Sequence, residues 1–138
     1  MKKFIVLILF VLISCTKSEE SSNNLLLSKI VGNWKVVGYY DDIEDSETGS
    51  NYHLVENGPV TTYKPDKTFD HIYSSTEVYY GNYSISMDSI LTMNYSTTAS
   101  GEPYLYKTKI FLLNDAVLEF ASETSETWGM RFEKINTP

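Results

Sequence analysis

Apolar and polar residues alternate along most of the chain after Gly32, with the period of two that is typical of β-strands. Eight segments have this alternation: 33–40, 58–64, 67–74, 77–86, 89–97, 103–113, 116–122 and 126–135. Most connections between them are short turns, such as KPDK at 64–67 and LNDA at 113–116. Because connections of this length join antiparallel neighbours, the pattern predicts eight antiparallel strands in chain order.

Each predicted strand has one apolar face and one mostly polar face. Trp34 is followed by Lys35, for example, and Leu118 and Phe120 flank Glu119. A sheet of this kind can wrap around a single interior, and closing it into a barrel removes both exposed edges. A sandwich of two sheets uses the same number of strands and stays open as the alternative.

Residues 24–31 have a helical pattern instead. Asn24 can cap the first turn, and Gly32 ends the helix. The apolar stripe consists of Leu26, Leu27, Ile30 and Val31. Two turns of helix are unstable alone, so this segment must pack on the sheet. The predicted fold is therefore all-β: an eight-stranded antiparallel up-and-down barrel with a short N-terminal helix.

The first residues have the organisation of an export signal. Lys2 and Lys3 precede ten apolar residues, Phe4 to Ile13, which are followed by Ser14 and Cys15. Ten residues of helix rise about 15 Å, half of the roughly 30 Å hydrocarbon core, so the run is too short to span a membrane. We expect a signal peptide over 1–14, a flexible tether without apolar residues over 15–23, and one domain over 24–138.

The run LISC at 12–15 resembles the lipobox of bacterial lipoproteins, in which the cysteine becomes the first mature residue and carries the acyl chains. The resemblance implies lipidation of Cys15 and anchoring in the cell outer membrane. Glu19 and Glu20 are similar to the surface-export signals of some lipoproteins, but a solvated tether explains them equally well. The periplasmic face and the cell surface therefore both remain open, as does an ordinary secretory signal with a chance cysteine.

Charge and cysteine content exclude several classes of function. The chain has 11 basic and 18 acidic residues, and the signal peptide would take Lys2 and Lys3 with it. Such an acidic protein is poorly suited to nucleic acid or to electrostatic adhesion to anionic lipid. Cys15 is the single cysteine, so its acylation would leave no thiol for a disulfide, for nucleophilic catalysis or for a zinc–cysteine site.

Several motifs together resemble the bacterial lipocalin-like lipoproteins of the lipocalin superfamily. They are, in order, GNWKVVGYY, YKPDKTF, GNYSISMDSILTMNY, LNDAVLEF and WGMRFEKI. The first contains the G-x-W signature, as Gly32 and Trp34. Lys67 stands where the family usually has a glycine in its turn, which questions the turn type and not the hairpin. The resemblance implies a barrel that is open at one end.

The same resemblance implies how the barrel is closed at its other end. Lipocalins pack the signature tryptophan there under an arginine from the last strand. Arg131 is the single arginine of the chain and lies in the predicted last strand. We therefore expect Gly32, Trp34 and Arg131 to form the closed end, with Arg131 against the Trp34 indole. Strand alternation alone favours a solvent-facing Arg131 instead.

Tyrosines supply the candidate binding residues. The chain has 11 of them, and five fall on the presumed inner face: Tyr63, Tyr83, Tyr95, Tyr104 and Tyr106. A tyrosine combines a flat apolar body with a polar tip, which suits a pocket for a ring-bearing, partly polar molecule. An eight-stranded barrel can equally be filled by its own side chains, so a pocket and a plug both remain open.

The sequence gives little support to a metal site or to catalysis. His53 and His71 are the two histidines, and Asp70 precedes His71, but neighbours in a strand point to opposite faces and cannot form a dyad. The acidic segment 41–57 lacks the spacing of a calcium loop and reads as a solvated lid. We expect no cofactor, no metal and no enzyme activity.

The predicted function is that of a monomeric, membrane-anchored lipocalin-like protein that binds a small hydrophobic or aromatic ligand in its barrel. The alternative belongs to another class: a protein–protein interaction module, such as an inhibitor or accessory subunit of the cell envelope, which uses the acidic segment as its contact. A hollow interior distinguishes the two, because a binder needs a cavity and a module does not.

Overall fold

The computed structural model describes residues 17–41, 52–96, 101–122 and 128–136. Within these ranges the chain forms one helix and nine strands: α1 (Lys17–Ile30), β1 (Gly32–Asp41), β2 (Tyr52–Leu54), β3 (Val60–Tyr63), β4 (Thr68–Ile72), β5 (Val78–Ile85), β6 (Ile90–Tyr95), β7 (Tyr104–Leu113), β8 (Val117–Ser122) and β9 (Trp128–Ile135). The helix is too short and too polar to cross a membrane, and the described residues contain no other.

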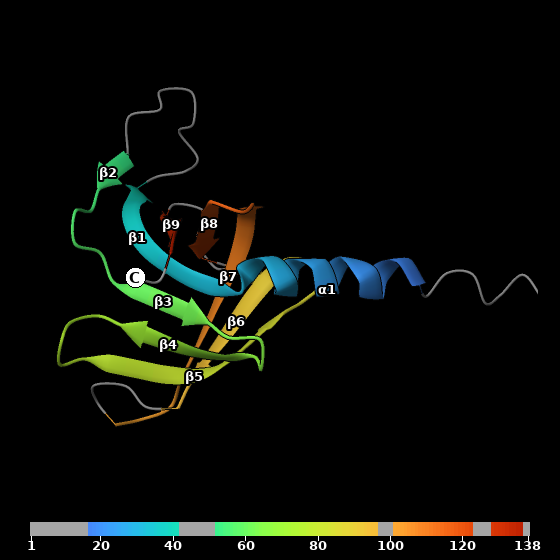
Figure 1. Cartoon of the computed structure of the whole chain (residues 1–138), viewed down its shortest axis with the longest axis horizontal. Coiled ribbons are helices and arrows are strands. Elements are labelled where there is room, and N and C mark those ends of the chain that lie inside the picture. The colour runs from blue at the N-terminus through green and yellow to red at the C-terminus, as the bar shows by residue number, and fades with distance from the viewer. Residues whose placement is uncertain (1–16, 42–51, 97–100, 123–127, 137–138) are drawn as a thin grey trace, which may run out of the picture.

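All strands belong to one antiparallel sheet that closes on itself. Its order is β2-β1-β3-β4-β5-β6-β7-β8-β9, and β1 also pairs with β9 (Figure 1). Each of the eight predicted strands is present and pairs with the next one in antiparallel orientation. Pairing of the first long strand with the last confirms the closed eight-stranded barrel and excludes the two-sheet sandwich.

β2 is the strand that the alternation pattern did not predict. It pairs with the second half of β1, from Gly38 to Tyr40, whereas β3 pairs with the first half, from Gly32 to Lys35. The two short strands thus follow one another along the same edge of β1. Between them the chain comes so close to β1 that a Cβ on Gly58 would lie 2.1 Å from the Val36 carbonyl oxygen, so this position requires glycine.

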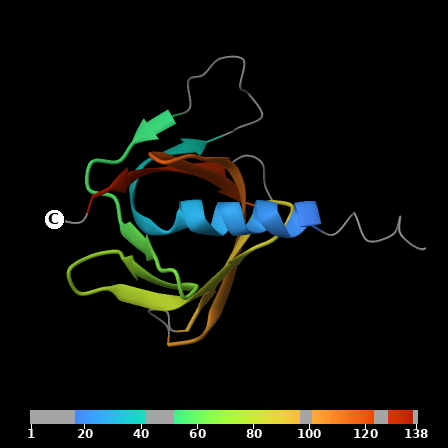
Figure 2. The same ribbon diagram turned by 45° about the vertical axis from the view of Figure 1, so that its right-hand side comes forward.

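The helix differs from the prediction in where it begins. It starts at Lys17 and not at Asn24, so residues 17–23, expected to be part of a flexible tether, are helical. α1 lies across one end of the barrel (Figure 2), and only Val31 separates it from β1. Gly32 makes this abrupt change of direction with a φ of 137°, which other residues rarely adopt.

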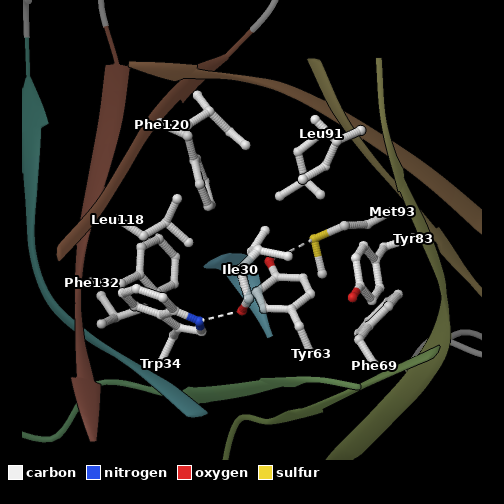
Figure 3. Close-up of a cluster of buried hydrophobic side chains, with 13 residues drawn as sticks. Ile30, Trp34, Tyr63, Phe69, Tyr83, Leu91, Met93, Leu118, Phe120 and Phe132 are labelled. Atoms are coloured by element: carbon white, nitrogen blue, oxygen red, sulfur yellow. Dashed lines mark hydrogen bonds between the residues drawn. The ribbon is translucent and has the colours of Figure 1, made fainter. Parts of the chain in front are cut away.

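The hydrophobic core fills the end of the barrel that α1 covers. Figure 3 shows side chains from α1 and from most of the strands meeting there, among them Ile30, Trp34, Phe69, Leu91 and Leu118, which are completely buried. The Trp34 indole nitrogen donates a 2.6 Å hydrogen bond to the Ile30 carbonyl at the end of α1. Trp34 therefore closes the barrel, as the resemblance led us to expect, and its indole also satisfies the carbonyl of the last residue of α1.

The predicted contact between Arg131 and Trp34 is wrong. The cation over the indole is Lys134, whose Nζ lies 5.0 Å from the ring centroid. The register explains the exchange, because Trp34 is directly opposite Lys134 whereas Arg131 is opposite Gly38. Alternation places 130, 132 and 134 on the inner face of β9, so Arg131 points outward. There it forms an ion pair with Glu119, which also accepts a hydrogen bond from Tyr40.

Candidate functional site: a cavity at the open end of the barrel

The half of the barrel away from α1 is hollow. Its interior contains a cavity of about 560 Å³, within the range of small-molecule binding sites. The cavity begins where the core ends: along β4 the buried Phe69 is followed two residues later by His71 in the cavity wall, and along β6 Leu91 is followed by Met93 and Tyr95. The interior is therefore half plug and half pocket, which resolves the question that the sequence left open.

Aromatic side chains make up most of the wall. They come from the inner faces of six strands: Tyr63, Tyr79, Tyr95, Tyr104, Tyr106, Phe120, Trp128 and Phe132. Two methionines, Met93 and Met130, complete the apolar part, and their thioethers make favourable contacts with aromatic rings. The polar members are Thr61 and His71. None of the described residues that line the cavity is an aspartate, glutamate, lysine or arginine.

Tyr63 forms the floor of the cavity. Its ring is fully buried, Tyr83 packs edge-on against it with 5.0 Å between ring centroids, and its hydroxyl lies 3.5 Å from the Met93 sulfur. Burial raises the pKa of the Tyr63 phenol well above its usual value, and the neighbouring tyrosines add to the shift. Tyr83 itself lies below the floor and donates a 2.8 Å hydrogen bond to the Lys64 carbonyl.

Tyr95 lies at the centre of a group of aromatic rings in the wall. Its ring is perpendicular to that of Phe69 at 4.8 Å and lies 6.4 Å from His71, 6.5 Å from Tyr79 and 6.3 Å from Tyr104. Burial raises the pKa of Tyr95 to about 12, so its phenol is neutral at physiological pH. Tyr104 is 55% exposed, which places it at the mouth of the cavity.

His71 provides the most polar group in the wall. It lies directly opposite Thr61 across the β3–β4 pair, and its Nδ1 is 2.8 Å from the threonine hydroxyl. Burial lowers the pKa of His71, which keeps the imidazole neutral at physiological pH. Asp70 points to the other face of β4 and pairs with Lys64 at 2.6 Å, which confirms that Asp70 and His71 form no dyad.

His53 has a different environment outside the cavity. Its Nε2 lies 3.1 Å from an Asp41 carboxylate oxygen, and its ring stacks on Tyr39 at 4.7 Å. Among the residues with described positions, no three potential ligands come together as a metal site. Most of the predicted acidic lid, residues 42–51, lies outside the described residues, as does Cys15.

The structure brings together four of the five predicted tyrosines, Tyr63, Tyr95, Tyr104 and Tyr106, in the cavity wall. Tyr83 belongs to the core below them. Sequence reasoning missed further wall residues, although the same alternation contained the signal for them. Tyr79 is in phase with Tyr83, His71 with Phe69, and Trp128 with Phe132, so each of the three shares the inner face of its strand.

Neither the protein-family models nor the curated protein sequences contain a match to this chain. The comparison of structures does find similarity. A lipocalin-like protein from Bacteroides uniformis superposes with a TM-score of 0.58 over 78% of this chain and 99% of that one, at 14% sequence identity. Identity this low bears on the fold alone. Together with the closed antiparallel barrel, the helix across one end and the cavity at the other, it shows that the chain has a lipocalin-like fold.

Proposed function

We propose that this protein binds a small, mostly apolar or aromatic molecule in the barrel cavity, and that acyl chains on Cys15 hold it at the outer membrane. The observation that carries the binding role is the hollow, aromatic interior of about 560 Å³, whose described lining has no charged side chain. Its volume is ample for a ligand with several rings. The fold supports the proposal because a barrel of this size either fills itself or holds one small ligand.

The lining gives the ligand its expected character. Stacking and edge-to-face contacts with tyrosine, phenylalanine and tryptophan favour flat rings, and each such pair contributes about 0.5–1.5 kcal/mol beyond area burial. The two methionines can adapt to different ring shapes. A protein–protein module needs no such interior, so the cavity favours binding over the alternative. Thr61 and His71 lie side by side, but the described lining includes no carboxylate to orient the histidine, so we propose no catalytic role.

Native mass spectrometry of protein purified from its own host tests the binding role, since it detects a retained small molecule directly. A second test uses the neutral fluorescent probe N-phenyl-1-naphthylamine. Met130→Trp should fill the cavity and reduce probe binding at least tenfold. Leu105→Trp is the matched control, because Leu105 is 54% exposed on the outer face of β7. Equal binding by the two variants, or none by the wild-type protein, would contradict the proposal.

The anchor has an independent test. Cys15→Ser should prevent acylation and release the protein from the membrane fraction. We expect an all-or-none effect, because two or more acyl chains anchor stably where one is marginal. The measurement is fractionation of host cells followed by a high-salt wash. A variant that stays with the membranes after the wash would refute lipid anchoring and leave the binding role untouched.

A further inference from the structure

His71 has a fixed hydrogen-bonding direction that the other polar groups of the cavity lack. A tyrosine hydroxyl rotates and can both donate and accept, so it discriminates poorly between ligands. In a neutral imidazole one ring nitrogen donates a hydrogen bond and the other accepts one. The hydrogen-bond partner of one nitrogen therefore determines whether the other is a donor or an acceptor. At His71 the partner of Nδ1 is the Thr61 hydroxyl, 2.8 Å away.

The burial of Thr61 determines which nitrogen carries the proton. Thr61 is 2% exposed, and within the described residues its hydroxyl has no other hydrogen-bond partner. If Nδ1 carried the proton, the threonine O–H would be a buried donor without an acceptor, which is costly. If Nδ1 is unprotonated, the threonine donates to it and both groups are satisfied. We assign the second arrangement, which places the proton on Nε2.

Nε2–H is then a donor with no partner among the described residues, in a side chain that lines the cavity. The imidazole is held between rings: Tyr79 lies nearly parallel to it, with 24° between the planes, and Tyr95 lies nearly perpendicular, at 79°. A ring held in this way offers its N–H in one direction. The absence of charged residues from the described lining means that an ionised ligand group would find no counter-ion there.

From this geometry we infer the chemical class of the ligand: an uncharged, ring-bearing molecule with one acceptor oxygen, such as a ketone or ester carbonyl, that takes the hydrogen bond from His71 Nε2. The inference rests on the proposed binding function and makes His71 the residue that determines specificity. The lowered pKa of His71 is consistent with it, because the imidazole is neutral where the ligand is neutral.

The test uses isothermal titration calorimetry to compare 9-fluorenone with fluorene, which has a methylene group in place of the carbonyl. One hydrogen bond contributes about 1 kcal/mol net, so wild-type protein should bind fluorenone about fivefold more tightly than fluorene. His71→Phe keeps a ring and removes the donor, so it should reduce the ratio of the two affinities to about one. His53→Phe is the matched control, because His53 lies outside the cavity, and it should keep the preference.

Two further measurements protect the test against a variant that is merely misfolded. The side-chain nitrogen chemical shifts of His71 in the wild-type protein show which nitrogen carries the proton, and the Nε2–H signal should move on addition of fluorenone and not of fluorene. Tyr95→Phe removes a competing hydroxyl and should keep the preference. A proton on Nδ1, equal affinity for both probes, or a preference that Tyr95→Phe abolishes would overturn the inference. Failure of both probes to bind would refute the proposed function itself.

Discussion

Replacement of Trp34 by phenylalanine should destabilise the protein far more than the same change at the other tryptophan. Trp34 is completely buried at the closed end, where its indole N–H donates to the Ile30 carbonyl and its ring lies under Lys134. Trp128 lines the cavity and is only partly buried. Trp128→Phe is therefore a matched control with the same chemistry and a different location.

Three losses add up at Trp34. The Ile30 carbonyl loses its donor in a buried place, which costs about 1–3 kcal/mol. The smaller ring leaves a void, which costs about 1 kcal/mol of stability. Phenylalanine also attracts the Lys134 ammonium less than tryptophan does, which costs about 0.5 kcal/mol more. We expect the free energy of unfolding to fall by about 3 kcal/mol. For a domain of this size that corresponds to a fall of about 12 °C in Tm.

Urea unfolding followed by far-UV circular dichroism measures the effect without relying on tryptophan fluorescence. Trp128→Phe should cost less than about 1 kcal/mol. Lys134→Met keeps the alkyl chain and removes the charge, so the double variant isolates the cation–π interaction in a mutant cycle. If Trp34→Phe costs less than 1 kcal/mol, or no more than Trp128→Phe, then the closed end does not depend on the indole and our account of it is wrong.

Three further predictions concern Tyr95, the turn at Lys67 and two glycines. The pKa of Tyr95 in the folded protein, about 12, lies above that of an unfolded tyrosine, so its contribution to stability is complete below about pH 10 and is lost as the pH rises toward 12. In Tyr95→Phe the free energy of unfolding should therefore depend less steeply on pH between about pH 9 and 12, and an unchanged slope would contradict this. Lys67 has a φ of 66°, so Lys67→Gly should raise the free energy of unfolding by about 1 kcal/mol, and a loss would show that the lysine side chain stabilises the turn. A Cβ on Gly81 would lie 2.0 Å from the Asn94 carbonyl oxygen, so Gly81→Ala should lower the free energy of unfolding by about 3 kcal/mol. Gly101 has no atom within 4 Å of such a Cβ, so Gly101→Ala should lower it by about 1 kcal/mol, from the positive φ alone. Equal losses would refute the steric argument.

Period-two alternation was sufficient to predict the eight barrel strands, because every strand buries one face and exposes the other. It could not predict β2, a three-residue strand held to β1 by backbone pairing with little burial of its own. The helical pattern placed the start of α1 too late, because residues 17–23 contain no apolar residue and no periodicity marks them as helical.

The closed end shows a different limit. Sequence and family resemblance identified Trp34 correctly, but the choice of its cation depended on register. Strand alternation already favoured a solvent-facing Arg131, but only the register of β1 against β9 shows that Lys134 lies opposite Trp34. At the site, the inner-face tyrosines followed from alternation, whereas the Thr61–His71 pair joins residues of two strands and depends on their register.

Closure between β1 and β9 has a consequence for how the chain folds. β1 forms from residues near the start of the domain and β9 from residues near its end. The edge of β1 opposite β2 and β3 therefore remains unpaired until β9 arrives. The contacts that complete the structure are therefore among the most distant in the sequence, which makes folding slower than that of a helical protein of equal length. As long as synthesis or transport holds the C-terminal strand, β9 cannot pair with β1 and the barrel stays open.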